Sequence, residues 1–191
     1  MKIVFATHNP NKVREINAML GDELEIVGLD EIGCTEDIPE TQATIVGNAL
    51  QKARYVKEHF GLDCFAEDTG LEVDALDGEP GVYTARYAGP ARDADANMAK
   101  VLRGLAGNPN RGAQFRTVIA LILNGEEHTF EGIARGSITE TKKGTKGFGY
   151  DPIFVPTGYE KTFAELSAAE KNKISHRGKA TALLQNFLQA L

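Results

Sequence analysis

The chain has 191 residues, of which 42% are hydrophobic and 25% charged, and its formal net charge is −6. This length supports one well-buried core and is too short to argue for two independent domains, so we expect a single domain over residues 1–191. The negative charge argues against a general nucleic-acid binder, which needs an excess of lysine and arginine on one face, but it allows a polyphosphate bridged to the protein by a divalent metal.

No apolar run approaches the roughly 18 residues that span a bilayer. The opening stretch MKIVFATHNP also lacks the long apolar region and cleavage site of a secretory signal. We therefore expect a cytoplasmic protein without a membrane partner. Cys34 and Cys64 show no metal-ligand spacing, which favours buried thiols over a zinc site or a disulfide.

The first predicted elements are a buried strand at 2–6 and a helix from Pro10 to Leu20. Asn9 is a typical N-cap, proline suits the first helical position, and Gly21 ends the helix. Lys12 then lies in the first turn, at the positive end of the helix dipole, where an exposed lysine costs about 0.3–1 kcal/mol. An anion beside it would remove that penalty.

A second strand is predicted at 24–29, followed by a polar and acidic loop at 30–43. A helix then runs to its stop at Gly61, with one apolar face formed by Ile45, Ala49, Ala53, Val56 and Phe60. The loop carries Glu40. This carboxylate can hold Mg²⁺ together with one other carboxylate, although an acid before a helix is also favourable on structural grounds alone.

Two short strands, at 64–66 and 71–76, are predicted to flank an acidic turn, EDTG, at 67–70. Ligands of α/β sheets usually sit at strand ends, and adjacent strand residues point to opposite faces. We therefore take Asp68 as the principal site residue and Glu67 as a second or water-mediated metal ligand. A solvated acidic turn is the alternative.

Farther along, GVYTARYAG at 81–89 suggests a helical turn and 93–105 a helix. Strands at 115–123 and 128–138 are joined across Asn124-Gly125, a strong hairpin signal, so the fold class is α/β with a mixed sheet. Ser167 and Glu170 form a capping box. The terminal helix has an apolar face of Leu183, Leu184, Phe187, Leu188 and Leu191.

Two further stretches suggest ligand binding. In GFGYDPIF at 147–154, two glycines flank Phe148, which can stack on a nucleobase, and Asp151 can accept hydrogen bonds from a base edge or cap a turn. In SHRGKA at 175–180, Ser175 can cap a helix whose first turn then holds His176 and Arg177, with Lys171 nearby; these cations suit an anionic or carbonyl-rich ligand. A packed glycine turn and a solvated surface are the respective alternatives.

The sequence contains no GxSxG nucleophile elbow, HExxH zinc motif or GxGxxG dinucleotide loop. Acyl hydrolysis, metalloproteolysis and classical dinucleotide binding therefore lose their usual support. Metal-assisted phosphate chemistry is the class that the remaining motifs favour.

Together and in this order, THNPNK, AEDTG, GVYTARYAG, GFGYDPIF and SHRGKA resemble the motifs of the inosine/xanthosine triphosphate pyrophosphatase family. The resemblance spans nearly the whole chain. It implies an elongated mixed-sheet α/β fold with two lobes around a central active-site cleft, a homodimer, and Mg²⁺-dependent hydrolysis of ITP, dITP and XTP to the monophosphate and pyrophosphate.

The resemblance also implies roles for individual residues. Asp68 is expected to be catalytic and metal-linked, with Glu40 as the other metal-side acid and Glu67 as a further candidate. The implied substrate-binding residues are Thr7, His8, Asn9, Pro10, Asn11, Lys12, Thr69, Phe148, Gly149, Tyr150, Asp151, Lys171, His176 and Arg177. One departure is that Gly47-Asn48 stands where members commonly have Glu-Asn.

In the expected reaction, a water attacks the α-phosphorus while metal and Lys12 offset the charge on departing pyrophosphate. Asp68 either deprotonates that water or mainly holds metal, because direct coordination would make it a poor base. A donor such as Arg177 would donate a hydrogen bond to the 6-oxo group of the purine and would disfavour adenine, at about 1–3 kcal/mol per buried mismatch.

Two other readings of the sequence stay open. A sister family of Maf-like nucleotide pyrophosphatases would differ in the base it prefers, but its usual Ser-x-x-Arg loop is absent here. A non-catalytic nucleotide-binding regulator would use the same residues to sense nucleotides, and it has no need of Lys12, Glu40 and Asp68 together. A purely structural protein would leave both cationic helix starts unexplained.

Overall fold

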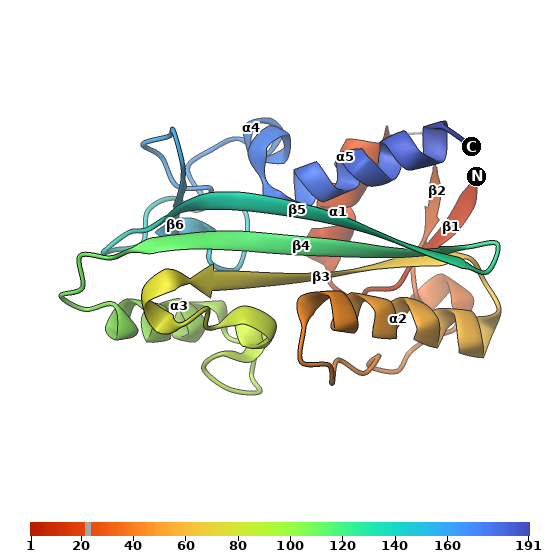
Figure 1. The fold of residues 1–191 in the computed structure, drawn as a ribbon, viewed down its shortest axis with the longest axis horizontal. Coiled ribbons are helices and arrows are strands. Elements are labelled where there is room, and N and C mark those ends of the chain that lie inside the picture. The colour runs from red at the N-terminus through yellow and green to blue at the C-terminus, as the bar shows by residue number, and fades with distance from the viewer. Residues whose placement is uncertain (22–23) are drawn as a thin grey trace. The chain divides into compact units, whose positions relative to one another are not determined.

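The structure is a computed structural model that describes residues 1–21 and 24–191 of the chain (Figure 1). Its strands are β1 (Lys2–Phe5), β2 (Glu25–Val27), β3 (Cys64–Val73), β4 (Gly112–Leu123), β5 (Glu126–Ile138) and β6 (Phe154–Pro156). Its α-helices are α1 (Pro10–Leu20), α2 (Ile45–Phe60), α3 (Ala94–Gly104), α4 (Ala168–Ile174) and α5 (His176–Gln189). Short 3₁₀ turns are η2 (Asp30–Ile32), η3 (Asp74–Leu76), η4 (Gly81–Arg86) and η5 (Asp151–Ile153).

Among the described residues, the strands form one six-stranded sheet in the order β2-β1-β3-β4-β5-β6. β1 is parallel to both β2 and β3, whereas β6 is antiparallel to β5. β4 and β5 are joined by Asn124 and Gly125, whose φ angles of 51° and 85° suit the type I′ turn expected of Asn-Gly. The mixed-sheet α/β class predicted from the sequence is therefore confirmed.

The chain divides into two compact units. Unit 1 comprises Met1–Asp68, Thr117–Gly132 and Arg177–Leu191, and unit 2 comprises Thr69–Arg116 and Ile133–His176. The division falls between Asp68 and Thr69, two residues of the same motif. Each unit is described separately below.

In unit 1, α5 lies on one side of the sheet and α2 on the other (Figure 1). A hydrophobic cluster joins strand residues such as Phe5 and Phe65 to Ile16 of α1 and Leu184 of α5. Phe5 and Phe65 stack with ring centroids 4.5 Å apart. On the α2 side, the thiol of Cys64 donates to the carbonyl of Ala53 over 3.2 Å. In this part of β3, Phe65 and Glu67 therefore face α1 and α5, whereas Cys64 and Asp68 face α2.

In unit 2, a second hydrophobic cluster packs β3, β4 and β5 against α3 and the segment after η5. Its aromatic centre consists of Phe115, Phe154 and Phe163. The imidazole of His176 stacks on Phe115, with ring centroids 4.5 Å apart and planes at 15°. The end of α4 and the start of α5 are thereby fixed to this core.

The caps explain why the predicted helices form. Asn9 accepts hydrogen bonds from the amides of Asn11 and Lys12, and Thr44 accepts one from Gly47. Gly21 and Gly61 end α1 and α2, both with positive φ. The predicted bounds of both helices are confirmed, and the capping interaction of Ser167 with Glu170 is present at the start of α4.

Two structural predictions were wrong. The EDTG stretch is no turn, because β3 continues through it from Cys64 to Val73. β4 lies beside β3 in the sheet, the carbonyl of Glu67 accepts a hydrogen bond from Lys52, and the amide of Leu71 donates one to Thr84, so these backbone groups find partners without a bend. In α5, Leu184 is fully buried but Leu183 is 47% exposed, since neighbouring positions lie about 100° apart around a helix, and Leu191, which lies beyond the end of α5 at Gln189, is 73% exposed.

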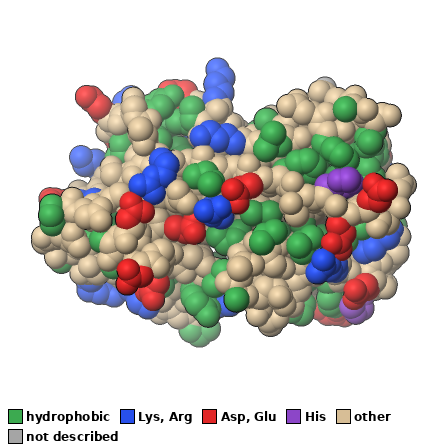
Figure 2. All heavy atoms as spheres, in the orientation of Figure 1, with side chains coloured by type: hydrophobic (Ala, Val, Ile, Leu, Met, Phe, Trp, Pro, Cys, Tyr) green, Lys and Arg blue, Asp and Glu red, His purple; other side chains and the backbone are tan. Residues whose placement is uncertain are grey.

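No helix in the described part of the chain is long and apolar enough to cross a membrane. On the face drawn in Figure 2, acidic and basic side chains are interspersed over the surface.

Candidate functional site

β3 carries the two acidic residues at the centre of the predicted site, and both are buried. Their carboxylates serve different faces of the sheet because they are adjacent in an extended strand. Glu67 meets side chains of α1 and α5, whereas Asp68 meets a side chain of α2. The alternative of a solvated acidic turn is contradicted, since Glu67 is 0% and Asp68 7% exposed.

Glu67 holds two cations from the two predicted cationic helix starts. The guanidinium of Arg177 donates to both of its oxygens, over 2.9 Å from Nε and 3.0 Å from Nη2. The ammonium of Lys12 lies 2.7 Å from Oε1. Glu15 of α1 completes the cluster by accepting a 2.7 Å hydrogen bond from Nη1 of Arg177. The anion that the sequence demands beside Lys12 is thus Glu67 of the chain itself.

Electrostatics favour the fully charged cluster. Burial alone would raise the pKa of Glu67, but the charges and hydrogen bonds of Arg177 and Lys12 outweigh it and hold that pKa well below its ordinary value. Burial likewise opposes the charge of Arg177, but Glu67 and Glu15 raise its pKa. Both oxygens of Glu67 are engaged by Arg177 and Lys12 in this structure, and its role as a further metal ligand stays a prediction.

Asp68 lies in a second cluster, on the α2 side. The ammonium of Lys52 is 2.5 Å from Oε1 of Glu40 and 3.8 Å from Oδ1 of Asp68, and it donates to the carbonyl of Glu67 over 2.8 Å. Two carboxylates from distant parts of the sequence, the loop before α2 and β3, therefore meet at one positive charge. The pairing of Glu40 with Asp68 on which the prediction depends is present.

The other oxygen of Asp68 has an unusual environment. Among the described residues, no hydrogen-bond partner contacts Oδ2, although that atom is buried. A buried carboxylate oxygen without a partner is costly, and such an atom calls for a functional explanation. Burial also raises the pKa of Asp68 above its ordinary value, although the charges of Lys52 and Lys12 lower it.

These residues fit a magnesium ion. Mg²⁺ is commonly held by one or two carboxylates, with water and substrate phosphate completing its shell. Glu40 and Asp68 supply that number, and the buried Oδ2 is an acceptor in need of a partner. No group of three or more His, Cys, Asp or Glu side chains gathers as a metal centre within residues 1–21 and 24–191, so a site made by the protein alone, such as a zinc centre, is not indicated.

The rest of the THNPNK stretch forms the loop before α1. The hydroxyl of Thr7 accepts from the amide of Asn9, and His8 contacts the carbonyl of Glu36 over 3.1 Å. Pro10 and Asn11 open the helix. This loop and Lys12 belong to unit 1, together with Glu40, Glu67, Asp68 and Arg177.

The remaining predicted residues belong to unit 2. Asp151 accepts a hydrogen bond from the amide of Phe148 over 3.0 Å and one from Lys171 over 2.7 Å. The ammonium of Lys171 lies 5.0 Å from the centre of the Phe148 ring, within cation–π range. A side chain at Gly147 would begin 2.1 Å from Oδ2 of Asp151, so only glycine allows this turn. Phe148 and Gly149 are half-buried, whereas Tyr150, Asp151, Lys171 and His176 are buried.

The predicted site therefore consists of two sets of residues, each gathered within one unit. Thr69, which follows Asp68 in β3, is half-buried and opens unit 2. The base-reading role of Arg177 stays a prediction, because its guanidinium is engaged by Glu67 and Glu15 in this structure.

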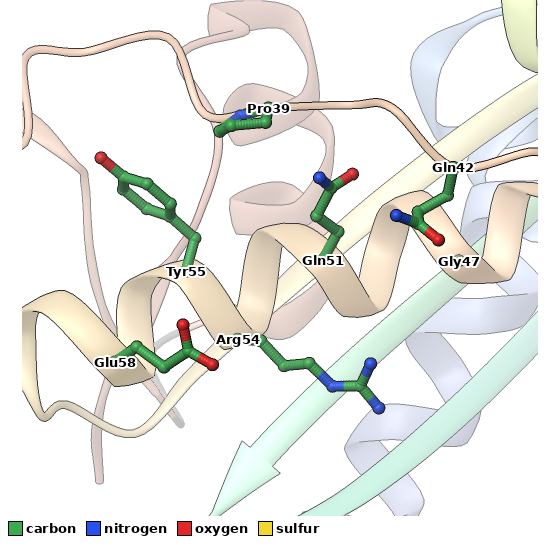
Figure 3. Close-up of a pocket in the computed structure, with 7 residues that line it drawn as sticks. All are labelled: Pro39, Gln42, Gly47, Gln51, Arg54, Tyr55 and Glu58. Carbon is green, nitrogen blue, oxygen red and sulfur yellow. The ribbon is translucent and has the colours of Figure 1, made fainter.

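Gly47 explains how the loop with Glu40 approaches α2. A side chain at this position would begin 2.8 Å from Cβ of Gln42 and 2.9 Å from the hydroxyl of Thr44. Asn48 then holds the loop by accepting from the amide of Gln42 over 2.9 Å. Figure 3 shows the pocket of about 320 Å³ that the loop and α2 enclose. Its seven lining residues include Gly47 but neither Glu40 nor Asp68.

The sequence analysis missed Lys52. A signal for it was present: Lys52 follows Ala49 by three positions and precedes Val56 by four, so it falls on the buried face of α2. A lysine there needs an anionic partner.

Comparison with known proteins gives the family of this chain. A family model described as the Ham1 family matches residues 3–187. A Flavobacterium johnsoniae protein named dITP/XTP pyrophosphatase is 59% identical over 190 residues, covering 100% of this chain and 99% of its own. The solved structure of a HAM1 protein from Coxiella burnetii is similar, with a TM-score of 0.92, 38% identity and full coverage of both chains. The Staphylococcus aureus Ham1 protein gives a TM-score of 0.91 and 39% identity over 100% of this chain and 99% of its own. A match of this extent, on a chain whose acidic and basic site residues lie where the motifs predict, shows that the protein belongs to the Ham1 family.

Proposed function

We propose that the protein hydrolyses non-canonical purine nucleoside triphosphates, ITP, dITP and XTP, to the nucleoside monophosphate and pyrophosphate. The observation that carries this proposal is the Asp68 site, where a buried carboxylate with an unpartnered oxygen faces Lys52 and Glu40. The relative from Flavobacterium johnsoniae, which is 59% identical, bears the name dITP/XTP pyrophosphatase. Removal of such nucleotides would cleanse the nucleotide pool.

Asp68 has two oxygens with different surroundings, and we give them different tasks. Oδ1 lies on the side of Lys52 and Glu40, and we propose that Glu40 would hold Mg²⁺ directly whereas Asp68 would do so only through a water, which leaves its carboxylate able to act as a base. Mg²⁺, when bound, would offset the negative charge of the triphosphate and of departing pyrophosphate. We propose that Oδ2 accepts the proton of the attacking water, because burial raises the pKa of Asp68 toward the range in which a general base works.

Lys12 and Lys52 would supply further positive charge. Both ammonium groups are held in place by carboxylates or carbonyls before any substrate binds. Charges fixed in advance need no reorganisation when negative charge develops on the leaving group. Water attacks the α-phosphorus, the bond from that phosphorus to the bridging oxygen breaks, and pyrophosphate departs.

We propose that the purine stacks on Phe148. The turn that carries this ring is held by Asp151, which accepts from the Phe148 amide and from Lys171. A ring on a rigid turn loses less freedom when a base stacks on it.

The direct test is pyrophosphate release by the purified protein with Mg²⁺, with ITP, dITP and XTP compared against ATP, GTP, dTTP and UTP. We expect strong preference for the first three, no turnover without a divalent metal, and none by Asp68→Asn. Asp95→Asn is a matched control, since Asp95 is exposed in an ion pair with Lys142. Preference for dTTP or UTP would contradict the proposed substrate class, and no release from any nucleotide would contradict the proposed reaction.

We also propose that the protein is a homodimer that acts in the cytoplasm. The dimer is what the resemblance of the motifs implies. The cytoplasmic location is supported by two buried free cysteines, Cys34 and Cys64, which suit a reducing compartment. Light scattering coupled to size-exclusion chromatography measures the mass in solution, and the mass of a single subunit would contradict the homodimer. Fractionation of the source cells tests the cytoplasmic location.

A further inference from the structure

The segment GVYTARYAG at 81–89 has no role in the function proposed above. It forms η4 and the residues that follow. Thr84, near its centre, makes two hydrogen bonds through its hydroxyl. Oγ1 accepts from the amide of Leu71 over 2.9 Å and donates to the carbonyl of Gly81 over 2.7 Å. The side chain of Thr84 therefore ties this segment to β3, two residues after Thr69.

The same residue also contacts the turn with Phe148. The carbonyl of Thr84 accepts a hydrogen bond of 2.7 Å from the hydroxyl of Tyr150. Tyr150 is 4% exposed, and its ring is part of the hydrophobic cluster of unit 2. Its ring and hydroxyl are both engaged inside the protein, so Tyr150 supports the turn that presents Phe148 and does not itself stack on a base.

Asn97 fixes the position of the Thr84 carbonyl from the other side. It lies on the buried face of α3 and is 3% exposed. Its carboxamide accepts from the amide of Ala88 over 2.7 Å and donates to the carbonyls of Ala85, over 3.0 Å, and Thr84, over 3.4 Å. Both ends of the amide are used, which holds the backbone of this segment at several points.

We propose that Thr84 is a positioning residue for purine binding, with Tyr150 and Asn97 as its supports. Thr84 links β3, through Leu71, to the Phe148–Asp151 turn, through Tyr150, and so sets where the stacking ring stands. None of the three side chains has to touch the substrate. This inference rests on the proposed function, because it assumes that Phe148 receives the base.

A structural role alone would predict a different outcome from a positioning role. Loss of general stability would affect the whole nucleotide site. Loss of the support for Phe148 would weaken contacts with the base and leave contacts with the phosphates unchanged. The two are separated by comparing a ligand that has a purine with one that has none, and inorganic tripolyphosphate serves as the second.

The experiment compares Thr84→Val, which removes the hydroxyl at nearly constant shape, with Thr84→Ser, which keeps it. We expect Thr84→Val to raise the KM for ITP about tenfold, the effect of losing one or two buried hydrogen bonds, with kcat within about twofold. The inhibition constant of tripolyphosphate should stay within about twofold, and Thr84→Ser should resemble wild type. The calorimetric Kd of inosine monophosphate should rise by the same factor as KM.

A second pair of variants keeps the inference testable if Thr84→Val does not fold. Tyr150→Phe removes only the hydroxyl that contacts Thr84 and should reproduce the higher KM. Tyr87→Phe is its control, because Tyr87 lies in the same segment but its hydroxyl donates to the exposed side chain of Glu79. It should leave KM unchanged.

The inference is overturned if Thr84→Val and Thr84→Ser give the same KM, if Tyr150→Phe does not differ from Tyr87→Phe, or if the constants for ITP and tripolyphosphate rise together. Failure of the proposed function looks different. In that case the wild-type protein hydrolyses no ITP, and the Kd of inosine monophosphate for the same variants still decides whether Thr84 positions a base-binding turn.

Discussion

Replacement of Glu67 by glutamine should lower the stability of the protein far more than the same replacement of Glu127, which pairs with Arg54 at the surface. Glu67 is fully buried and accepts from Arg177 through both oxygens, with Lys12 at 2.7 Å. Glutamine has nearly the same shape but no charge, and its amide nitrogen would point a donor at groups that are themselves donors. Two buried cations would be left with Glu15 as the remaining carboxylate of the cluster.

The magnitude follows from the burial. Removal of one partner from a buried ion pair costs about 3–5 kcal/mol of unfolding free energy. Glu15 still pairs with Arg177, so we expect the lower end, about 3 kcal/mol. For a chain of this length, each kcal/mol lowers Tm by about 2–4 °C, which gives a decrease of about 6–12 °C.

The pH dependence has a definite sign. Because the pKa of Glu67 is lower in the folded protein than in the unfolded chain, the carboxylate stabilises the fold above its unfolded pKa of about 4.3 and loses this effect as pH falls toward the folded pKa. The stability difference between wild type and Glu67→Gln should therefore be constant from pH 8 to about pH 5 and shrink below about pH 4.

The assay is calorimetric and urea unfolding at pH 7 and at pH 4. The matched control is Glu127→Gln, because Glu127 also accepts two hydrogen bonds from one arginine, Arg54, but both side chains are well exposed. That change should cost less than about 1 kcal/mol. Equal costs for the two variants, or a Glu67→Gln difference that grows in acid, would refute the assignment of Glu67 as the charge centre of the cluster.

Three further predictions follow from the site and the core. Asp68→Asn should lower kcat by at least about 10²-fold. At pH 7 and above the variant should be as stable as wild type or more stable, because the pKa of Asp68 is raised in the folded protein and its ionisation therefore opposes folding as pH rises through that value. A variant that urea unfolds more easily than wild type would contradict this. Lys52→Met should lower kcat by about 10²–10³-fold, whereas Lys57→Met should not, because Lys57 lies on the same helix but in a half-exposed ion pair with Asp63; equal kinetics of the two variants would remove Lys52 from the site. The thiols of Cys34 and Cys64 should not react with a disulfide reagent at pH 8 until the protein is unfolded, because both are buried. Burial raises the pKa of Cys34 and raises that of Cys64 to about 12. Rapid labelling of the native protein would show that one of the two thiols is accessible.

Helices α1 and α2 could be predicted to the residue because local signals fix both of their ends. Asn9, Pro10 and Gly21 are sufficient for the first, and the apolar face from Ile45 with Gly61 for the second. The path of β3 through Asp68 could not be predicted in the same way. Gly70 after acidic residues is a local turn signal, and the neighbouring strands that keep this stretch extended are distant in sequence.

The site shows the same division. Asp68 was found because it follows a buried strand and precedes a glycine, Glu40 because it lies in an acidic loop before a helix, and Lys12 because a lysine in a first helical turn is locally unfavourable. The partner of Lys12 was out of reach, since Glu67 is distant from it in the sequence and only the fold brings the two together. Lys52 was within reach, because a lysine on the apolar face of a helix is visible in the periodicity of α2.

The order of Glu67 and Asp68 along β3 decides which face of the sheet each carboxylate occupies. One is saturated with cations and belongs to the scaffold, whereas its neighbour retains an oxygen for chemistry, and only the parity of the strand separates them. Insertion or deletion of a single residue between Cys64 and Glu67 would exchange the two faces, with Glu67 turned toward Lys52 and Asp68 toward Arg177. This strand can therefore accept many substitutions over evolution but no change of length, and variation in length among related chains should be confined to loops such as 30–43.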